Sequence, residues 1–386
     1  MMKKSFDEIV VFARTGLNPR TNFKLGKGTN KYITIKNIHN NTILIDDNTD
    51  VVDDEAIKLI HKRSQIKKGD ILFCSIGRLG DMYIIQDKPI GWDINESVFA
   101  FTLNTDLIRQ KFFYYVFKHH KTIEFLSKNS SGSTFKSIKM NQLKRMTFDV
   151  PTLEEQDNII TVLDNVCKII ELLKQQIQQL DELVKARFIE LFGDPEINPK
   201  NLNKVLLSEI AEYFNGLTYA PDNVSDNGIV VLRSSNIQNS QLDFNDTVRV
   251  NCVIKEKLYV KDNDILMCAR NGSAKLVGKV ALINNIAEPM TFGAFMMIIR
   301  SEYYPYLMTY FQMDAFRRQI TTGATTTINQ ITGNMLNKIS LPLPEMDDVK
   351  QFADFVKQID KSKVVVQKAL DEAQTLFDSL MQEYFG

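Results

Sequence analysis

The sequence lacks several features that would assign it a class at once. No apolar run approaches the roughly 20 residues that cross a bilayer, so we expect no membrane span. Residues Met1 to Glu8 contain no apolar segment, which predicts no signal peptide and a cytoplasmic protein. The few cysteines have neither metal-ligand nor redox spacing and are expected to be reduced thiols: Cys74, Cys167, Cys252 and Cys268.

Net charge is also absent, because 47 Lys and Arg balance 47 Asp and Glu. A balanced chain is not a generic nucleic-acid coating protein. The charges are unevenly placed: residues 1–150 carry 24 basic against 16 acidic side chains, whereas residues 151–193 carry 4 against 8. A basic first segment is compatible with phosphate contact.

Motifs of catalysis are missing as well. An adenine methyltransferase needs Asn or Asp followed by Pro-Pro and an aromatic residue, and Asp194-Pro195 and Asn198-Pro199 lack the second proline. A phosphate loop needs Gly-x4-Gly-Lys-Ser/Thr, and Gly272 to Lys279 has neither the spacing nor the hydroxyl. We therefore expect no catalytic residue and no cofactor of the chain's own.

Two short patterns resemble sites but have simpler interpretations. Ser133 and Lys136 fit Ser-x-x-Lys, yet the accompanying motifs of that enzyme class are absent, so a polar loop is expected. His119 and His120 are adjacent and have no further ligand at metal spacing. We expect them on an exposed helix face, and we expect no metal site.

What the sequence does contain is an internal repeat with a period of half the chain. The matched segments are Glu190–Gly193 with Glu383–Gly386, Val150-Pro151 with Leu343-Pro344, Lys68–Cys74 with Asp262–Cys268, and Ser130–Thr134 with Thr321–Thr325. One such match could arise by chance, but the ordered set indicates a fused repeat.

Each repeat begins with about 150 residues of mixed α/β pattern. Alternating or apolar runs between turn residues predict strands at 32–38, 70–76, 82–85 and 97–103, and in the second copy at 229–233, 264–269, 279–283 and 292–300. A helical stretch is predicted over 107–126.

Each repeat ends in a long helix with a heptad seam of apolar residues. The seam residues are Ile159, Leu163, Val166, Ile170, Leu173, Ile177, Leu180 and Val184 in the first copy, and Phe352, Val356, Ile359, Val366, Leu370, Ala373 and Phe377 in the second. Only Lys363 interrupts the second seam. Each helix has one apolar stripe, so we expect the two to pack against each other, and a pseudo-twofold makes the pair antiparallel.

The predicted fold class is therefore mixed α/β: two repeated domains separated by two long antiparallel coiled-coil helices related by a pseudo-twofold. The expected boundaries are 1–150 for the first domain, 151–193 for the first helix, 194–343 for the second domain and 344–386 for the second helix.

With these elements the chain resembles the specificity subunits of type I restriction-modification enzymes. The resemblance covers essentially the whole chain and rests on the half-chain repeat, on Lys68–Leu72, on Gly132–Thr134, and on Val150–Gln156 leading into a long helix. The second copy departs from the pattern, since Val349 stands where the first copy has Gln156.

The resemblance implies two target-recognition domains, each reading one half of a split site on double-stranded DNA. It also implies helices that hold two methyltransferase subunits and, through them, restriction subunits with motor and nuclease activity. S-adenosylmethionine, ATP and Mg²⁺ would then belong to those partner subunits.

Base reading needs side chains such as Arg, Asn, Ser and Thr, and such residues recur in matched loops of both copies. The candidate DNA-binding residues are Arg14, Arg20, Asn37, Ser75, Arg78, Ser131, Ser133, Thr134 and Lys136 in the first copy. In the second copy they are Arg233, Ser234, Asn236, Arg270, Asn271, Ser273, Lys275, Thr322, Thr325 and Thr327. For any single residue a solvated turn is the simpler interpretation, whereas for each loop as a whole we favour DNA contact.

Two alternatives stay open on the sequence alone. A coiled-coil scaffold with two protein-binding domains would show no salt-dependent, sequence-selective DNA binding. A nuclease or methyltransferase with unrecognised motifs would act on DNA without partners.

Overall fold

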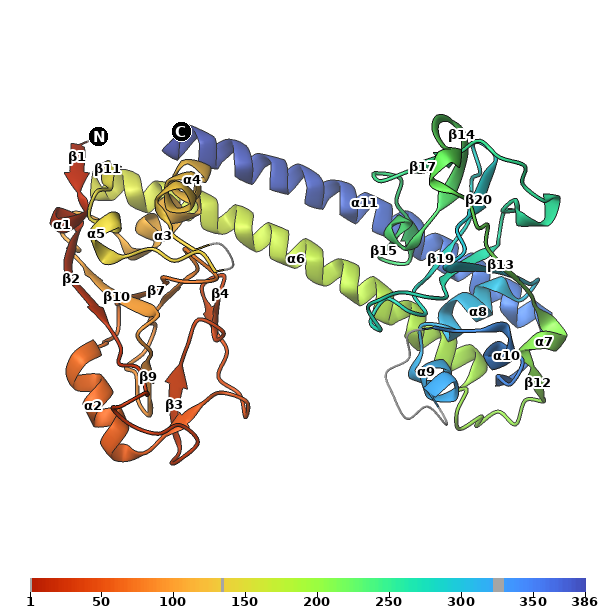
Figure 1. The fold of residues 1–386 in the computed structure, drawn as a ribbon, viewed down its shortest axis with the longest axis horizontal. Helices are drawn as coiled ribbons and strands as arrows, with labels where there is room; N and C mark the ends of the chain where they lie inside the picture. The colour runs from red at the N-terminus through yellow and green to blue at the C-terminus, as the bar shows by residue number, and fades with distance from the viewer. Residues whose placement is uncertain (1, 133–134, 322–329) are drawn as a thin grey trace. The chain divides into compact units, whose positions relative to one another are not determined.

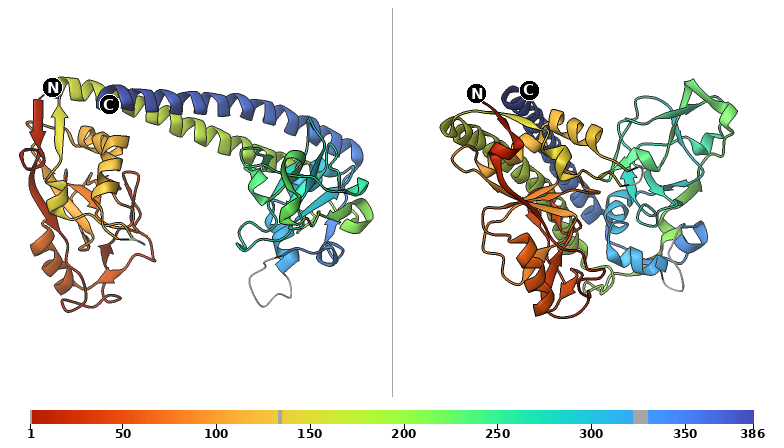
Figure 2. Two further views of the ribbon diagram at one scale, coloured as in Figure 1. Left: turned by 45° about the horizontal axis from the view of Figure 1, so that its top comes forward. Right: turned by 60° about the vertical axis from the view of Figure 1, so that its left-hand side comes forward.

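The computed structural model describes residues 2–132, 135–321 and 330–386. The chain divides into two compact units, Met1–Leu173 with Ala369–Gly386, and Lys174–Lys368. Two helices of 40 residues, α6 (Leu153–Phe192) and α11 (Met346–Phe385), each contribute one part to each unit. Figures 1 and 2 show both helices as uninterrupted ribbons.

The first unit places short helices among short strands. In chain order they are β1 (Met2–Ser5), α1 (Phe6–Ile9), β2 (Val10–Thr15), β3 (Asn30–Ile33), β4 (Ile38–His39), β5 (Thr42–Ile43), β6 (Val51–Val52), α2 (Asp54–Ser64), β7 (Ile71–Cys74), β8 (Met82–Ile84), β9 (Trp92–Ile94), β10 (Val98–Leu103), α3 (Gln110–Lys118), α4 (His120–Asn129), α5 (Met140–Leu143) and β11 (Thr147–Val150).

The second unit follows the same plan. Its elements are β12 (Lys204–Leu206), α7 (Leu207–Ile210), β13 (Glu212–Asn215), η1 (Pro221–Asn223), β14 (Val224–Leu232), η2 (Ser234–Asn236), β15 (Ile237–Gln238), β16 (Gln241–Leu242), β17 (Val248–Val250), η3 (Glu256–Leu258), β18 (Ile265–Cys268), β19 (Val280–Leu282), β20 (Met290–Phe292), β21 (Met296–Arg300), α8 (Tyr304–Tyr310), α9 (Asp314–Thr321), α10 (Gly333–Leu336) and β22 (Ser340–Pro342).

Sheet topology confirms the internal repeat. The four-stranded sheet β2-β10-β7-β8 of the first unit has the same order as β13-β21-β18-β19 of the second. The three-stranded sheets β6-β3-β9 and β17-β14-β20 each contain one parallel pair, and β4-β5 corresponds to the hairpin β15-β16. The two units therefore share one scaffold, on which differences between loops can be compared position by position.

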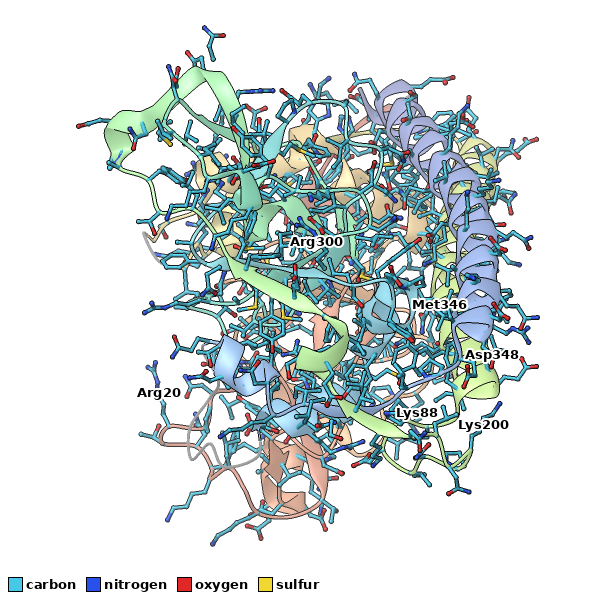
Figure 3. The ribbon with its side chains drawn as sticks, turned by 90° about the vertical axis from the view of Figure 1, so that its right-hand side faces the viewer. Arg20, Lys88, Lys200, Arg300, Met346 and Asp348 are labelled. Atoms are coloured by element: carbon cyan, nitrogen blue, oxygen red, sulfur yellow. The ribbon has the colours of Figure 1, made fainter. Side chains whose placement is uncertain are left out.

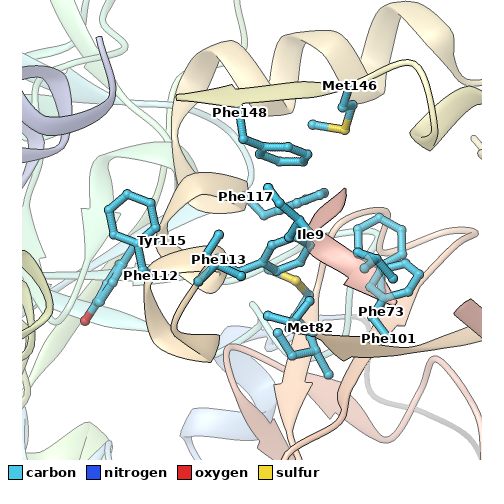
Figure 4. Close-up of a cluster of buried hydrophobic side chains, with 14 of the residues drawn as sticks. Ile9, Phe73, Met82, Phe101, Phe112, Phe113, Tyr115, Phe117, Met146 and Phe148 are labelled. Carbon is cyan, nitrogen blue, oxygen red and sulfur yellow. The ribbon is translucent and has the colours of Figure 1, made fainter. Parts of the chain in front are cut away.

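An aromatic cluster fills the core of the first unit (Figure 4). Phe101 of β10 lies 5.5 Å from Phe6 and 5.6 Å from Phe73, measured between ring centroids, and Phe113 of α3 lies 5.8 Å from Phe148. Side chains of this size bury much apolar area, and the edge-to-face contact of Phe101 with Phe6 adds to that stabilisation. The core joins the four-stranded sheet to α3 and β11, and so fixes the strand ends from which the loops leave.

The long helices enter both cores. In the first unit Leu163 of α6 is fully buried, and Phe385 of α11 lies 5.3 Å from Phe112. In the second unit Phe188 of α6 stacks on Tyr306 at 5.0 Å and meets Phe352 of α11 at 5.8 Å. The start of α6 thus shares a core with the end of α11, and the end of α6 with the start of α11, so the two helices run antiparallel within each unit.

Every apolar seam position along both helices is buried or half-buried. Four seam residues of α6 are buried, Ile159, Leu163, Val166 and Ile170, and the remaining four are half-buried. On α11 Phe352, Ile359 and Val366 are buried, and Val356, Leu370, Ala373 and Phe377 are half-buried. Lys363 is half-buried and donates to the carboxylate of Asp181, an exposed residue of α6, which gives this cation a partner beside the seam.

Gln156, in the first turn of α6, has a structural role. Gln156 is fully buried, accepts from the Arg109 amide at 2.8 Å, and donates to the carbonyls of Leu107 and Pro151 at 2.9 and 3.0 Å. The carboxamide oxygen and nitrogen of Gln156 thus both form hydrogen bonds that hold the start of α6. In the second copy the corresponding Val349 is 1% exposed and packs as an apolar residue.

Three of the expected elements are interrupted in the structure. The strand expected at 32–38 ends at Ile33, because the Asn37 carboxamide accepts from the Thr34 amide and closes a turn. The strand expected at 292–300 is broken at 293–295, where the Met296 amide donates to the Gly293 carbonyl. These were wrong as single strands because local turn hydrogen bonds outweigh apolar content.

The helix expected at 107–126 is also divided. His119 has ψ 142° between α3 and α4, so the adjacent histidines do not share a helix. His119 is only 3% exposed, which contradicts the expected exposed face. Burial, followed by the nearby His120, lowers the pKa of the His119 imidazole and favours its neutral form.

Candidate nucleic-acid interface

In the first unit three of the predicted polar loops meet beyond the end of β7. The Ile138 amide donates to the Ser75 carbonyl at 2.9 Å, and the Gly77 amide donates to the Lys136 carbonyl at 3.0 Å. Arg78 reaches the Ile38 carbonyl at 3.5 Å, which links the loop after β7 to β4. Segments far apart in sequence therefore form one polar surface, which we call the first loop cluster.

The second unit builds the same cluster beyond β18. The Ile331 amide donates to the Ala269 carbonyl at 2.7 Å, and Arg270 forms a backbone bridge with Gln330. The Asn271 carboxamide donates to the Ser234 hydroxyl at 3.2 Å, which brings in the loop after β14. This second loop cluster matches the first, because Ile331 and Ala269 repeat the bond made by Ile138 and Ser75.

The matched backbone shows which side chains replace one another. The Ser75 amide donates to the Ser97 carbonyl at 3.0 Å, and the Ala269 amide donates to the Phe295 carbonyl at 2.9 Å. Phe295 therefore stands where the first unit has Ser97, and Arg270 stands where it has Ile76. The scaffold is kept while side-chain chemistry at the cluster changes from small and apolar to cationic and aromatic.

Sequence reasoning missed the aromatic members of these clusters. Phe295 is 61% exposed, and the Arg270 guanidinium lies over its ring at 5.6 Å. Phe135 is 66% exposed in the loop that joins the first cluster. The signal in the sequence was an aromatic residue within a turn of small and polar residues, because such a turn offers no core in which the ring could be buried.

Several candidates are exposed, as a surface contact requires. They are Arg20, Arg78, Ser131, Lys136, Arg270, Ser273 and Lys275. Figure 3 shows the Arg20 side chain extending away from the ribbon. Of this group the loop clusters contain Arg78, Ser131, Lys136, Arg270 and Ser273, while Arg20 belongs to a separate turn after β2.

Other candidates are engaged within the fold. Arg14 lies on β2 rather than in a loop and pairs with the buried Asp70 at 2.8 Å. Ser75 is 7% exposed and donates to the Ser97 carbonyl at 2.8 Å. Arg233 pairs with Asp246 at 2.8 Å, with a third of its side chain exposed. The polar groups of Arg14, Ser75 and Arg233 are therefore bonded within the fold.

Asn37 and Asn236 have the same internal role in the two units. Asn37 donates to the Leu44 carbonyl at 3.0 Å, and Asn236 donates to the Asp243 carbonyl at 2.8 Å. Each also accepts from the amide three residues earlier, at 2.9 and 2.8 Å. Asn236 is 0% exposed, so its carboxamide holds a turn and does not face solvent.

Five candidates lie outside the described residues, and nothing further is said of them: Ser133, Thr134, Thr322, Thr325 and Thr327.

The buried thiols have the electrostatics of core residues. Burial, with a smaller effect of Asp81, raises the pKa of Cys74 to about 12, and burial raises the pKa of Cys268. A thiol held protonated is a poor nucleophile and metal ligand. Across residues 2–132, 135–321 and 330–386 no cluster of three metal-ligating side chains occurs. In the same ranges we find no helix whose length and hydropathy would suit a membrane span.

The family model described as "Type I restriction modification DNA specificity domain" matches residues 1–182 and 199–373, nearly the whole chain in two stretches. The chain belongs to this family.

Among curated proteins this specificity-family chain is 27% identical over 172 residues to the StySPI specificity subunit of Salmonella potsdam. It is 26% identical over 170 residues to the EcoKI specificity subunit of Escherichia coli. Each match covers 41% of this chain and 36% of the relative, so the aligned part is well under two thirds of those proteins. A putative MjaX specificity subunit of Methanocaldococcus jannaschii is 24% identical over 340 residues, 80% of this chain and 77% of that protein.

Solved structures show the same fold for this family member. The S subunit of the type I restriction-modification system of M. genitalium superposes with a TM-score of 0.55, 16% identity, and coverage of 100% of this chain and 96% of that one. A chain from a study of complex assembly in the type I restriction-modification system gives a TM-score of 0.60, 15% identity, and coverage of 100% and 97%. At these identities the likeness concerns the fold.

Proposed function

We propose that this chain is the DNA sequence-specificity subunit of a type I restriction-modification system, and that each unit reads one half of a bipartite target on double-stranded DNA. The observation that carries the proposal is the pair of loop clusters on one scaffold, with different side chains at matched positions. Ile76 and Ser97 in the first cluster become Arg270 and Phe295 in the second. Two readers of different half-sites need this combination of constant backbone and variable surface.

The remaining parts of the proposal follow from that role. The recognition domains comprise 1–150 and 194–343, and the helices 151–193 and 344–386 form an antiparallel coiled coil with pseudo-twofold symmetry. Their outer faces hold two methyltransferase subunits and, through these, the restriction subunits. Catalysis, S-adenosylmethionine, ATP and Mg²⁺ belong to those cytoplasmic partners, and the chain itself directs them.

Expression of the chain with its methyltransferase partner in an unmodified host tests the proposal. Methylome sequencing should reveal one split motif with a fixed spacer. Replacing Arg78 and Ser131 by alanine should relax the motif on one side, and replacing Arg270 and Asn271 should relax it on the other. Each lost direct base contact is worth about 1–3 kcal/mol.

Three outcomes would contradict it. Uniform relaxation of both halves by either double variant would mean that the clusters do not read separate half-sites. Absence of salt-dependent, sequence-selective DNA binding would favour a protein-binding scaffold. Methyl transfer or cleavage by the purified chain alone would make it an enzyme.

A further inference from the structure

Beside the second loop cluster lies a pocket of about 310 Å³. Its wall is formed by the β15–β16 hairpin, the start of β19, and the segment from the end of α8 into α9. Its described lining residues include two cations, Lys279 and Arg317, and no carboxylate.

The matching place in the first unit shows what is unusual about this pocket. The Cys74 amide donates to the Asp81 carbonyl at 2.8 Å, and the Cys268 amide donates to the Lys279 carbonyl at 2.9 Å. Gly80 and Gly278 repeat the next bond, to Cys74 and Cys268 at 3.1 and 2.8 Å. Lys279 therefore occupies the backbone position of Asp81.

In the first unit the charge of the Asp81 carboxylate is balanced by neighbouring side chains of the same unit. Asp81 lies 3.0 Å from the His39 ring and 3.4 Å from the Lys118 ammonium. His39 belongs to the β4–β5 hairpin, the counterpart of β15–β16, in which Gln238 and Asn239 face Lys279. The second unit has thus lost the carboxylate and gained a cation at the same point of the fold.

Arg317 adds a second positive charge to the pocket. Its Nη1 donates to the Val277 carbonyl at 2.6 Å, which anchors the guanidinium and leaves its other N–H groups for a ligand. The Ser240 hydroxyl donates to the Gln312 carboxamide oxygen at 3.0 Å, and Gln312 Nε2 donates to the Met308 carbonyl at 2.8 Å, which leaves Nε2 one further N–H. An anchored guanidinium and a nearby ammonium suit a phosphate group.

We propose that this pocket binds a phosphate group, and that the phosphate is one of the DNA backbone at the half-site read by the second unit. The identity of the source rests on the proposed function. The position supports it: the loop that carries Arg270 and Asn271 leaves the scaffold at Cys268 and returns at Gly278, next to Lys279. A phosphate held there would set the register of the duplex against the reading side chains, without conveying sequence itself.

The test compares Lys279→Gln with Lys257→Gln, a matched removal of an exposed lysine on η3 that does not line the pocket. The full chain with its methyltransferase partner is titrated with target and scrambled duplexes between 50 and 200 mM salt. Each phosphate contact contributes about 0.9 to the slope of log affinity against log salt. Lys279→Gln should reduce the fourfold-salt effect by about threefold and weaken both duplexes alike, whereas Lys257→Gln should change neither.

A second arm uses inorganic phosphate alone, observed by ³¹P NMR with the same variants, and Lys279→Asp, which installs the residue of the first unit. Wild type should bind phosphate, and Lys279→Gln and Lys279→Asp should not. Phosphate binding with an unchanged DNA slope would keep the phosphate site but replace the DNA backbone by a free phosphate. If the Lys279 variants keep both phosphate binding and the wild-type salt slope, the proposed site is wrong. Phosphate binding by a chain that binds no DNA overturns the proposed function and leaves the pocket as a phosphate site.

Discussion

Arg14 and Arg300 reach equivalent buried aspartates from different strands. Arg14 of β2 pairs with Asp70 at 2.8 Å, while Arg300 of β21 makes two 2.7 Å bonds to Asp264. In the register of the two sheets, Phe214 stands at the position of Arg14, and Arg300 stands at that of Thr102. The Arg300 guanidinium lies over the Phe214 ring at 5.2 Å. The fold thus keeps the ion pair while the cation changes strand.

This exchange predicts a rescue. Arg300→Thr should destabilise the protein by about 3 kcal/mol, because Asp264, 1% exposed, would lose its counterion. Phe214→Arg combined with Arg300→Thr recreates the arrangement of the first unit and should restore most of the loss, measured by urea unfolding. As a control, Arg318→Ala breaks an exposed pair with Glu196 and should cost under about 1 kcal/mol. A double variant no more stable than Arg300→Thr would show that the strands are not interchangeable.

Asn236→Ala should lower the stability of the fold rather than change base preference. The carboxamide donates to the carbonyls of Asp243 and Asp246 at 2.8 and 2.9 Å, and it is fully buried. Losing it leaves buried backbone groups unpaired, for about 2–4 kcal/mol in total. Asn37→Ala, at the half-buried counterpart, should cost less by the same unfolding assay. A stable Asn236→Ala variant with altered base preference would instead return this residue to the set of DNA readers.

Asp360, which lies near Lys363 and Asp181, predicts that the stability of the fold depends on pH. Burial, with Asp181 nearby, raises the pKa of Asp360 above 3.8, while Lys363 opposes the rise. Because the folded pKa is the higher one, this group stabilises the fold fully below the unfolded pKa, and the contribution disappears as pH rises through the folded pKa.

Lys363→Leu removes the opposing charge, so the pH window in which Asp360 loses its stabilising contribution should move upward. Unfolding free energies measured from pH 7 to pH 4 should shift progressively in favour of the leucine variant. The same comparison in an Asp360→Asn background should lose that trend. A trend that persists without Asp360 would assign it to other groups.

Phe295 should act through Arg270. Phe295→Ala removes the ring under the guanidinium, an exposed cation–π contact of about 0.5–1 kcal/mol. Selectivity at one base pair of the second half-site should fall by about two- to fivefold, with a larger loss for Arg270→Ala. Competition binding with duplexes varied at single positions measures both. Arg78→Ala serves as the matched control, since it should alter the first half-site alone.

How much of this could be predicted from sequence depends on the range of the interactions. The heptad seam follows from local periodicity, which predicts the buried stripe, and the matched segments half a chain apart predict that the two sheets share one strand order. Arg14, Asn37 and Asn236 look like surface readers in sequence, because their partners Asp70, Leu44 and Asp243 become neighbours only after folding. The cluster of Arg270 with Phe295 likewise depends on a sheet pairing that brings two distant turns together.

Where the second unit joins its helices, Leu206 of β12 is paired with Ser340 of β22. The polypeptide between them, 207–339, therefore leaves and returns through adjacent points of one strand pair. A foreign segment with the same two ends could replace it, provided that it keeps the side chains, such as Tyr306, that pack on Phe188 of α6. Under the proposed function, such an exchange would change the half-site read by the second unit, while α6 and α11 would keep the same surfaces.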